Sequence, residues 1–167
     1  MSAKMKPSRI LIIFAIILSF ITLPSHAEQA DLKYFTSGSY QQLLKEYADK
    51  PFVLMVWSIH CTTCLQKMPL LNELSKNMPG VNLVMLATDD ASASDQVKSI
   101  LAENELNKLD NWIFADTNPQ KLRYEIDPKW YGEVPRTYFV DKNHQRVGVS
   151  GALSRETYET MLKELFN

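Results

Sequence analysis

The sequence contains few of the residues from which metal sites and disulfide frameworks are built. Its 167 residues include only two cysteines and three histidines. A structural zinc site takes about four ligands, and the chain offers Cys61 and Cys64 with His60 and His144 far apart in sequence, so we expect no metal site. The 18 basic residues form no cluster and are balanced by 19 acidic residues. This charge pattern argues against a nucleic-acid partner.

The N-terminal segment has the pattern of a secretory signal peptide. Three basic residues and no acidic residue precede an apolar run over residues 10–23, and Ser25 and Ala27 are the small residues that a signal peptidase reads. We predict cleavage after Ala27, so that residues 1–27 are a signal peptide and residues 28–167 form one periplasmic domain. The run has about 14 residues where a bilayer span needs about 20, so only an uncleaved leader would contact the membrane.

Two residues separate the two cysteines, in the stretch Trp57-Ser-Ile-His-Cys-Thr-Thr-Cys64. So short a loop removes little entropy from the unfolded chain, which argues against a purely structural disulfide. An apolar strand pattern precedes the pair, and a helical pattern over residues 65–78 follows it. A cysteine at the N-terminus of a helix is favoured as the thiolate, its nucleophilic form. The stretch therefore predicts thiol–disulfide exchange, with Cys61 attacking and Cys64 resolving the mixed disulfide.

Strand and helix patterns alternate along the rest of the chain. Fully apolar runs at 52–57 and 82–87 indicate strands covered on both faces, and a turn at 141–144 indicates a final hairpin. The order implies an α/β fold with a mixed central sheet and helices on both faces. The expected strands are 32–35, 52–57, 82–87, 111–115, 136–140 and 146–150; the expected helices begin at Ser39 (with Gln42 in a capping box), Leu65, Ser94, Asn118 and Ser154.

These features together resemble a known family. The leader, the Trp57-x-x-x-Cys61-x-x-Cys64 motif, Pro69 in the following helix and Val134-Pro135 before a hairpin are similar to exported thioredoxin-like oxidoreductases of the TlpA/ResA type. The resemblance covers nearly all of the mature chain and implies a thioredoxin-like fold. It also implies that Pro135 is the family's cis-proline beside the dithiol, and that Val134 presents its backbone to an extended substrate segment.

Several positions depart from the family pattern. His60 replaces a tryptophan that relatives commonly carry, Lys67 replaces a glutamate, and Met55 stands where thioredoxin has a buried acid. A protonated His60 beside Cys61 would lower the thiol pKa and make the disulfide more oxidising, or His60 could simply fill an exposed position. The Thr62 and Thr63 hydroxyls could donate hydrogen bonds to a thiolate or cap the helix.

Other polar and aromatic residues are ambiguous. Trp57, Trp130 and Tyr131 could line the rim of the site, although Trp57 is as compatible with a core position. Asp89 and Asp90 end a predicted strand, but two adjacent acids with no further ligand pattern predict solvated side chains rather than a metal site.

The sequence therefore predicts a periplasmic thiol–disulfide oxidoreductase that acts on protein thiols and disulfides with a redox partner protein. We expect a monomer with no cofactor. The family resemblance implies that it works more as a reductant, for example in cytochrome c maturation. A peroxide-reducing enzyme of the same fold would need proline and threonine where the chain has Leu54 and Ser58. A thioredoxin-fold copper chaperone would have three residues between its cysteines, although His144 keeps it conceivable. A non-enzymatic binding module with a closed disulfide is the remaining alternative.

Overall fold

The computed structural model describes residues 31–78 and 80–166. The predicted signal peptide, residues 1–27, lies outside the described residues, so its cleavage and the compartment stay predictions. Within the part of the chain that the structure describes, every helix is too short or too polar to cross a bilayer.

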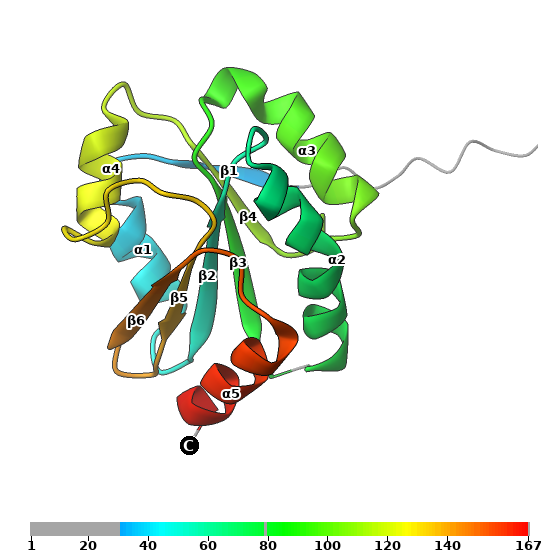
Figure 1. The fold of residues 1–167 in the computed structure, drawn as a ribbon. Helices are drawn as coiled ribbons and strands as arrows, with labels where there is room; N and C mark the ends of the chain where they lie inside the picture. Colours follow the sequence, from blue (N-terminus) through cyan, green and yellow to red (C-terminus); the bar gives the residue numbers. More distant parts are fainter. Residues whose placement is uncertain (1–30, 79, 167) are drawn as a thin grey trace, which may run out of the picture.

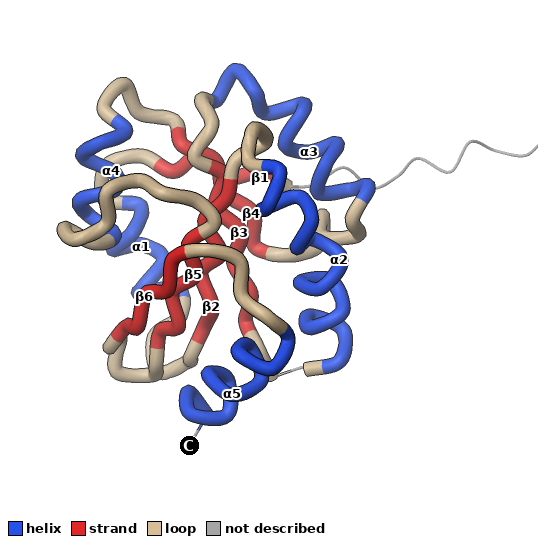
Figure 2. The backbone as a smooth tube through the Cα atoms, viewed as in Figure 1, coloured by secondary structure: helices blue, strands red, loops and turns tan. Residues whose placement is uncertain are grey.

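A six-stranded mixed sheet forms the centre of the domain (Figures 1 and 2). Its order is β1-β4-β3-β2-β5-β6; β1, β4, β3 and β2 run parallel, whereas β5 and β6 are antiparallel to their neighbours. Such a sheet is what alternating strands and helices followed by a hairpin predict. The strands are β1 (Leu32–Phe35), β2 (Phe52–Trp57), β3 (Asn82–Ala87), β4 (Asp110–Phe114), β5 (Arg136–Val140) and β6 (Arg146–Ser150).

Helices cover both faces of this sheet, so it has two apolar cores. On one face α2, α3 and α5 pack over Val53, Met55 and Trp57; on the other α1 and α4 pack over the alternate residues of β2. Every residue of β2 is buried because successive side chains point to opposite, equally covered faces. The helices are α1 (Ser39–Glu46), α2 (Thr62–Asn77), α3 (Ser94–Glu103), α4 (Pro119–Ile126) and α5 (Arg155–Phe166), with a short 3₁₀ helix η2 (Ala91–Ala93) before α3.

The predicted fold class is confirmed, and the differences lie at element ends. Five strands have their predicted bounds, while β4 begins and ends one residue earlier than expected. The α2 helix begins at Thr62, three residues before the first periodic apolar side chain, because Cys61 caps it. Asn118 caps α4 as predicted, accepting a hydrogen bond from the Lys121 N–H.

The predicted capping box at Ser39 and Gln42 is wrong. Gly38, with a φ of 87°, is the N-cap of α1, and Ser39 is already the first helical residue. The Ser39 hydroxyl instead accepts a hydrogen bond from the Thr36 N–H, at 2.9 Å, and stabilises the loop before the helix. Glycine adopts this left-handed conformation without steric cost, so the turn is made by Gly38 and needs no side-chain cap.

Candidate active site

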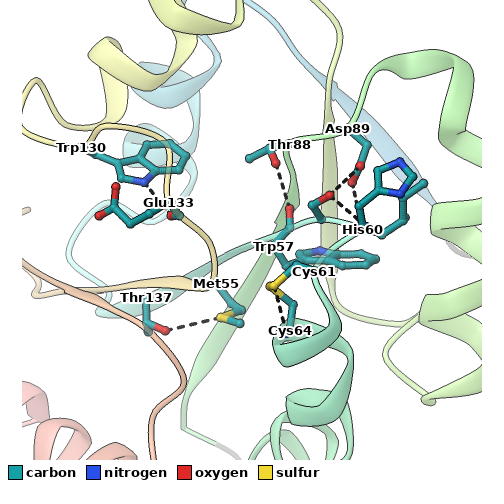
Figure 3. Close-up of a disulfide and its surroundings, with 12 residues drawn as sticks. Met55, Trp57, His60, Cys61, Cys64, Thr88, Asp89, Trp130, Glu133 and Thr137 are labelled. Carbon is teal, nitrogen blue, oxygen red and sulfur yellow. Dashed lines mark hydrogen bonds between the residues drawn. A yellow bond between two sulfur atoms is a disulfide. The ribbon is translucent and has the colours of Figure 1, made fainter.

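Cys61 and Cys64 form a disulfide at the N-terminus of α2 (Figure 3), with their Cα atoms 5.2 Å apart. Cys61 is the N-cap residue, with an extended backbone, and its Sγ accepts a hydrogen bond from the Cys64 N–H at 3.1 Å. Cys64 is 0% exposed, whereas Cys61 is partly exposed. Of the two cysteines, Cys61 is therefore the one accessible to a second protein, and it lies at a helix N-terminus, where N–H groups favour a negative charge.

The turn that leads from β2 into α2 is held by the end of β3. The Cys61 N–H donates to the Ser58 carbonyl at 3.1 Å, which closes the turn. Asp89 accepts hydrogen bonds from the Ser58 hydroxyl at 2.8 Å and from the Ile59 N–H at 3.0 Å. The prediction that Asp89 is merely solvated is therefore wrong. Asp90 does fit it, because it is exposed and its carboxylate caps η2 by accepting from the Ser92 N–H at 2.9 Å.

The Val134–Pro135 peptide bond is cis, as the family resemblance implied. It lies directly before β5, whose Arg136 pairs with Val56 near the end of β2. The Pro135 carbonyl accepts a hydrogen bond from the N–H of Gly151, the residue after β6, at 2.8 Å. This bond joins the Val134–Pro135 segment to the end of β6. Pro135 itself is buried and Val134 is partly buried. The sheet thus brings a segment some seventy residues away in sequence to the same edge as the turn that carries Cys61.

The side chains around the cysteines are exposed. Thr62 and Thr63 lie in the first turn of α2 and do not cap it, since Cys61 is the N-cap residue. The His60 N–H donates to the Ser58 hydroxyl, and in Figure 3 the His60 ring points away from the two sulfur atoms. Lys67, on the second turn of α2, is partly buried. The ring of His60 is therefore oriented as a surface group rather than as a partner of the Cys61 sulfur.

Three aromatic residues considered for the rim have different positions. Trp57 is 0% exposed and belongs to the core beneath α2. Trp130 is also buried, and its Nε1–H donates to the Glu133 carbonyl at 2.9 Å. Tyr131 is 93% exposed, in the loop that leads to Val134. Of these three residues, Tyr131 alone is exposed enough to contact a partner.

A buried cluster of hydroxyl groups and a thioether lies in the core around Met55. The Thr137 hydroxyl donates to the Met55 Sδ at 3.4 Å, and its oxygen is 3.2 Å from the Tyr158 hydroxyl. All three residues are buried, and Met55 and Tyr158 belong to the core cluster that also contains Cys64. Burial raises the pKa of Tyr158, so its hydroxyl stays neutral. Sequence reasoning found only the missing acid at Met55, because Thr137 and Tyr158 are 82 and 103 residues from it.

A network of charged groups fixes the loop between α4 and β5. Arg136 contacts Asp127 and Glu133, each at 3.3 Å, and the Ser150 hydroxyl donates to Glu133. Burial raises the pKa of Asp127, but the Lys129 N–H and the charges of nearby arginines outweigh it, so this pKa lies below its usual value. The loop that precedes the cis peptide is therefore held by contacts with Arg136 and Ser150.

The described residues offer no cage for a metal ion. Among residues 31–78 and 80–166, no three His, Cys, Asp or Glu side chains lie close enough together to hold one. His144 lies in the β5–β6 turn with a positive φ of 62°, and the sulfur atoms are engaged in the disulfide.

The profile of the AhpC/TSA family matches residues 26–146 of this sequence. The chain belongs to the AhpC/TSA family. Among solved structures, it is similar to a secreted disulfide oxidoreductase of Mycobacterium tuberculosis described as homologous to Escherichia coli DsbE. The TM-score is 0.59 with 22% identity, over 72% of this chain and 86% of that one.

Two further structures share this fold. An exposed lipoprotein thioredoxin of Streptococcus pneumoniae matches with a TM-score of 0.56 and 19% identity, over 73% of this chain and 90% of that one. StoA of Bacillus subtilis matches with a TM-score of 0.53 and 14% identity, over 69% of this chain and 84% of that one. The thioredoxin-like fold predicted from the sequence is confirmed.

Proposed function

We propose that this protein is an exported thiol–disulfide oxidoreductase that exchanges disulfides with protein partners through Cys61 and Cys64, and that it acts mainly as a reductant. The observation that carries the proposal is the arrangement of the two cysteines at the start of α2. The Cys61 sulfur is accessible and accepts a hydrogen bond from a helix N–H, whereas the Cys64 sulfur is buried. An attacking thiolate needs access and a stabilised charge, whereas a resolving thiol needs only to reach the first sulfur.

The exchange proceeds in two steps. The Cys61 thiolate attacks one sulfur of a partner disulfide, which forms a mixed disulfide and releases the other partner sulfur as a thiolate. The Cys64 thiol then loses its proton and attacks the Cys61 Sγ, and the second partner sulfur leaves as a thiolate. Two electrons have passed to the partner, and Cys61 and Cys64 end as the disulfide found in the structure. Helix N–H groups stabilise the negative charge on Cys61 before the first step.

The partner segment docks in extended form beside Val134. Pro135 is buried, so the segment meets the backbone of Val134 rather than the proline ring. Main-chain hydrogen bonds of this kind do not depend on the partner's side chains, so several proteins could be accepted. Tyr131, fully exposed in the preceding loop, adds an aromatic contact at the edge of this surface.

The preference for reduction is supported by the surroundings of Cys61. A cationic imidazole at the sulfur would favour an oxidant, but the His60 ring points away from it. The leader pattern supports export to the periplasm, as does the similarity to a protein described as secreted. The TlpA/ResA resemblance supports a role in cytochrome c maturation or in recycling other thiols.

The experiment that tests the proposal is insulin reduction by the wild-type protein and two cysteine variants. The wild type reduces insulin with dithiothreitol as electron donor, Cys61→Ser is inactive, and Cys64→Ser accumulates a mixed disulfide visible on non-reducing gels. Activity of Cys61→Ser equal to that of the wild type would contradict the proposal and favour a binding module. Equilibration with glutathione then fixes the direction: a potential near about −270 mV marks a reductant, and one near −120 mV an oxidant.

Peroxide reduction, the other chemistry of this fold considered from the sequence, has less support. Position 54 is leucine, and the proton of the Ser58 hydroxyl is donated to Asp89 at 2.8 Å. That hydroxyl is therefore not available to orient a peroxide at Cys61. A copper chaperone receives no support from the donor atoms brought together in the described residues.

A further inference from the structure

Both oxygens of the Asp89 carboxylate accept hydrogen bonds from the turn that carries the attacking cysteine. One oxygen accepts from the Ser58 hydroxyl at 2.8 Å, and the other accepts from the Ile59 N–H at 3.0 Å (Figure 3). Asp89 is partly buried and comes from the end of β3, 31 residues from Ser58. Both oxygens face the same turn, so the side chain acts as a clamp between two loops rather than as a helix cap.

The clamp continues the pairing of β2 and β3 beyond their last residues. The strand register ends at Trp57 and Ala87. The Thr88 N–H and hydroxyl then donate to the Trp57 carbonyl, at 2.9 and 3.2 Å. One residue after Thr88, the carboxylate of Asp89 accepts the Ile59 N–H in place of a strand carbonyl. These hydrogen bonds attach the turn after β2 to the rigid sheet.

From Asp89 a chain of hydrogen bonds reaches Cys61. The Ser58 hydroxyl gives its proton to Asp89 and accepts the His60 N–H at 3.1 Å. The Ser58 carbonyl accepts the Cys61 N–H at 3.1 Å. Cys64, by contrast, is positioned by its burial in the core beneath α2. The relative position of the two sulfur atoms therefore depends on how firmly the turn from Ser58 to Cys61 is held.

We propose that Asp89 is a positioning residue that keeps the reduced Cys61 sulfur over the Cys64 N–H; this rests on the proposed function in which Cys61 attacks as a thiolate. The N–H to sulfur hydrogen bond, 3.1 Å in the disulfide form, stabilises a thiolate when the disulfide opens. Without Asp89 the turn gains freedom and the sulfur spends less time in this position. The thiolate fraction and the rate of attack then fall.

The direction in which the reactivity of Cys61 changes distinguishes a positioning role of Asp89 from a simple effect of its charge. Removing a negative charge near a thiol, by itself, favours the thiolate and speeds its reactions. Loss of positioning has the opposite effect. Asp90 provides a matched control one residue away, because Asp90→Asn removes the same charge from an exposed side chain and asparagine caps a helix as well as aspartate does.

The test measures the rate at which iodoacetamide alkylates Cys61 between pH 5 and about 9, the range in which a thiol titrates. It compares the reduced wild type with four variants: Asp89→Ala, Asp89→Asn, Ser58→Ala and Asp90→Asn. We expect Asp89→Ala to react about fivefold more slowly at pH 7, the factor that loss of one ordinary hydrogen bond implies. The midpoint of its pH profile moves upward. Asp89→Asn retains one acceptor oxygen and recovers part of the rate, Ser58→Ala is slowed like Asp89→Ala, and Asp90→Asn stays within about twofold.

Thermal unfolding of each variant shows whether it folds. If Asp89→Ala does not fold, the comparison relies on Asp89→Asn, which is close in shape to the native residue. Alkylation of folded Asp89→Asn as fast as wild type or faster, or equal slowing in Asp90→Asn, overturns the proposal. These outcomes leave the proposed function standing if wild type still reduces insulin. Failure of wild type to reduce insulin removes the proposed function itself, whatever the alkylation rates.

Discussion

His60 stands directly before Cys61, the cysteine that we propose attacks, and shows how far a residue's identity can mislead without its orientation. Adjacency in sequence suggests a cation beside the sulfur, yet the backbone N–H of His60 donates to the Ser58 hydroxyl and its ring points away (Figure 3). Side chains of consecutive residues in a turn diverge, so neighbours in sequence need not be neighbours in space.

This orientation predicts that His60→Trp leaves the reduction potential of the Cys61/Cys64 pair nearly unchanged. We expect a shift below about 10 mV, which corresponds to roughly a twofold change in the equilibrium constant. The measurement is equilibration of wild type and variant against a series of glutathione buffers. A shift toward a more reducing potential of about 30 mV or more would show that the imidazole does act on the sulfur.

The hydroxyl pair of Thr137 and Tyr158 is predicted to stabilise the core as a unit. Thr137→Val and Tyr158→Phe should each lower the free energy of unfolding by about 1–2 kcal/mol, because each leaves the other hydroxyl short of a buried partner. The double variant should cost less than the two single changes added together. Urea unfolding measures all three. Tyr124→Phe, at an exposed tyrosine, is the control and should have little effect; simple additivity of the core pair would contradict the prediction.

At the scale of elements, the β5–β6 hairpin depends on a glycine opposite an aromatic ring. Gly148 pairs directly with Tyr138, and a Cβ at Gly148 would lie 2.7 Å from that ring and 2.6 Å from the Arg136 guanidinium. The Tyr138 ring is buried, edge-on to Trp130 and with the Arg136 guanidinium 5.0 Å from its centre. It cannot move aside without disturbing the strand that follows the cis peptide.

We therefore expect Gly148→Ala to lower the free energy of unfolding by about 1–3 kcal/mol, the usual range for overpacking. It should also reduce insulin-reduction activity by displacing the start of β5. Gly80→Ala is the matched control, since Gly80 has open space around its Cβ position and should be nearly neutral. Equal unfolding midpoints in urea for Gly148→Ala and wild type would rule out this close packing.

At the scale of the whole molecule, the charge network around Asp127 makes stability depend on pH. Burial acts to raise the pKa of Asp127, but the Lys129 N–H and the charges of Arg146 and Arg136 prevail, so the folded pKa lies below the ordinary 3.8. A carboxyl with a lowered pKa contributes stability above its unfolded value and loses it as the pH falls through the folded value. The contribution is thus present at pH 7 and lost on acidification below about 4.

Asp127→Asn should accordingly be less stable than wild type at pH 7, by about 1–3 kcal/mol for lost hydrogen bonds to a charged group. The difference should shrink toward pH 2–3, where the wild-type carboxyl also becomes neutral. Urea midpoints of both proteins at several pH values provide the measurement. A difference that stays constant from pH 7 to about pH 2 would mean that charge at Asp127 does not contribute.

Much of this protein could be predicted from local patterns. The fully apolar runs at β2 and β3, the turn before β6 and the Asn118 cap depend on residues close in sequence, and the structure agrees with each of them. The pairing of the two cysteines follows from their spacing, because a separation of three positions at the start of a helix brings the sulfur atoms together. The first helix was capped by Gly38 instead of Ser39, since both residue types suit that position and only the path of the chain selects one.

The tertiary structure alone decided which distant groups lie beside the Cys61–Cys64 turn and the core beneath it. Asp89 looked like one of two solvated acids, and only the parallel pairing of β3 with β2 brings its carboxylate to the Ser58 turn. Thr137 meets Met55 because β5 is antiparallel to β2. Sequence determines local chemistry, since propensity and spacing act over a few residues. Contacts across a sheet depend on strand order and register, which are properties of the whole folded chain.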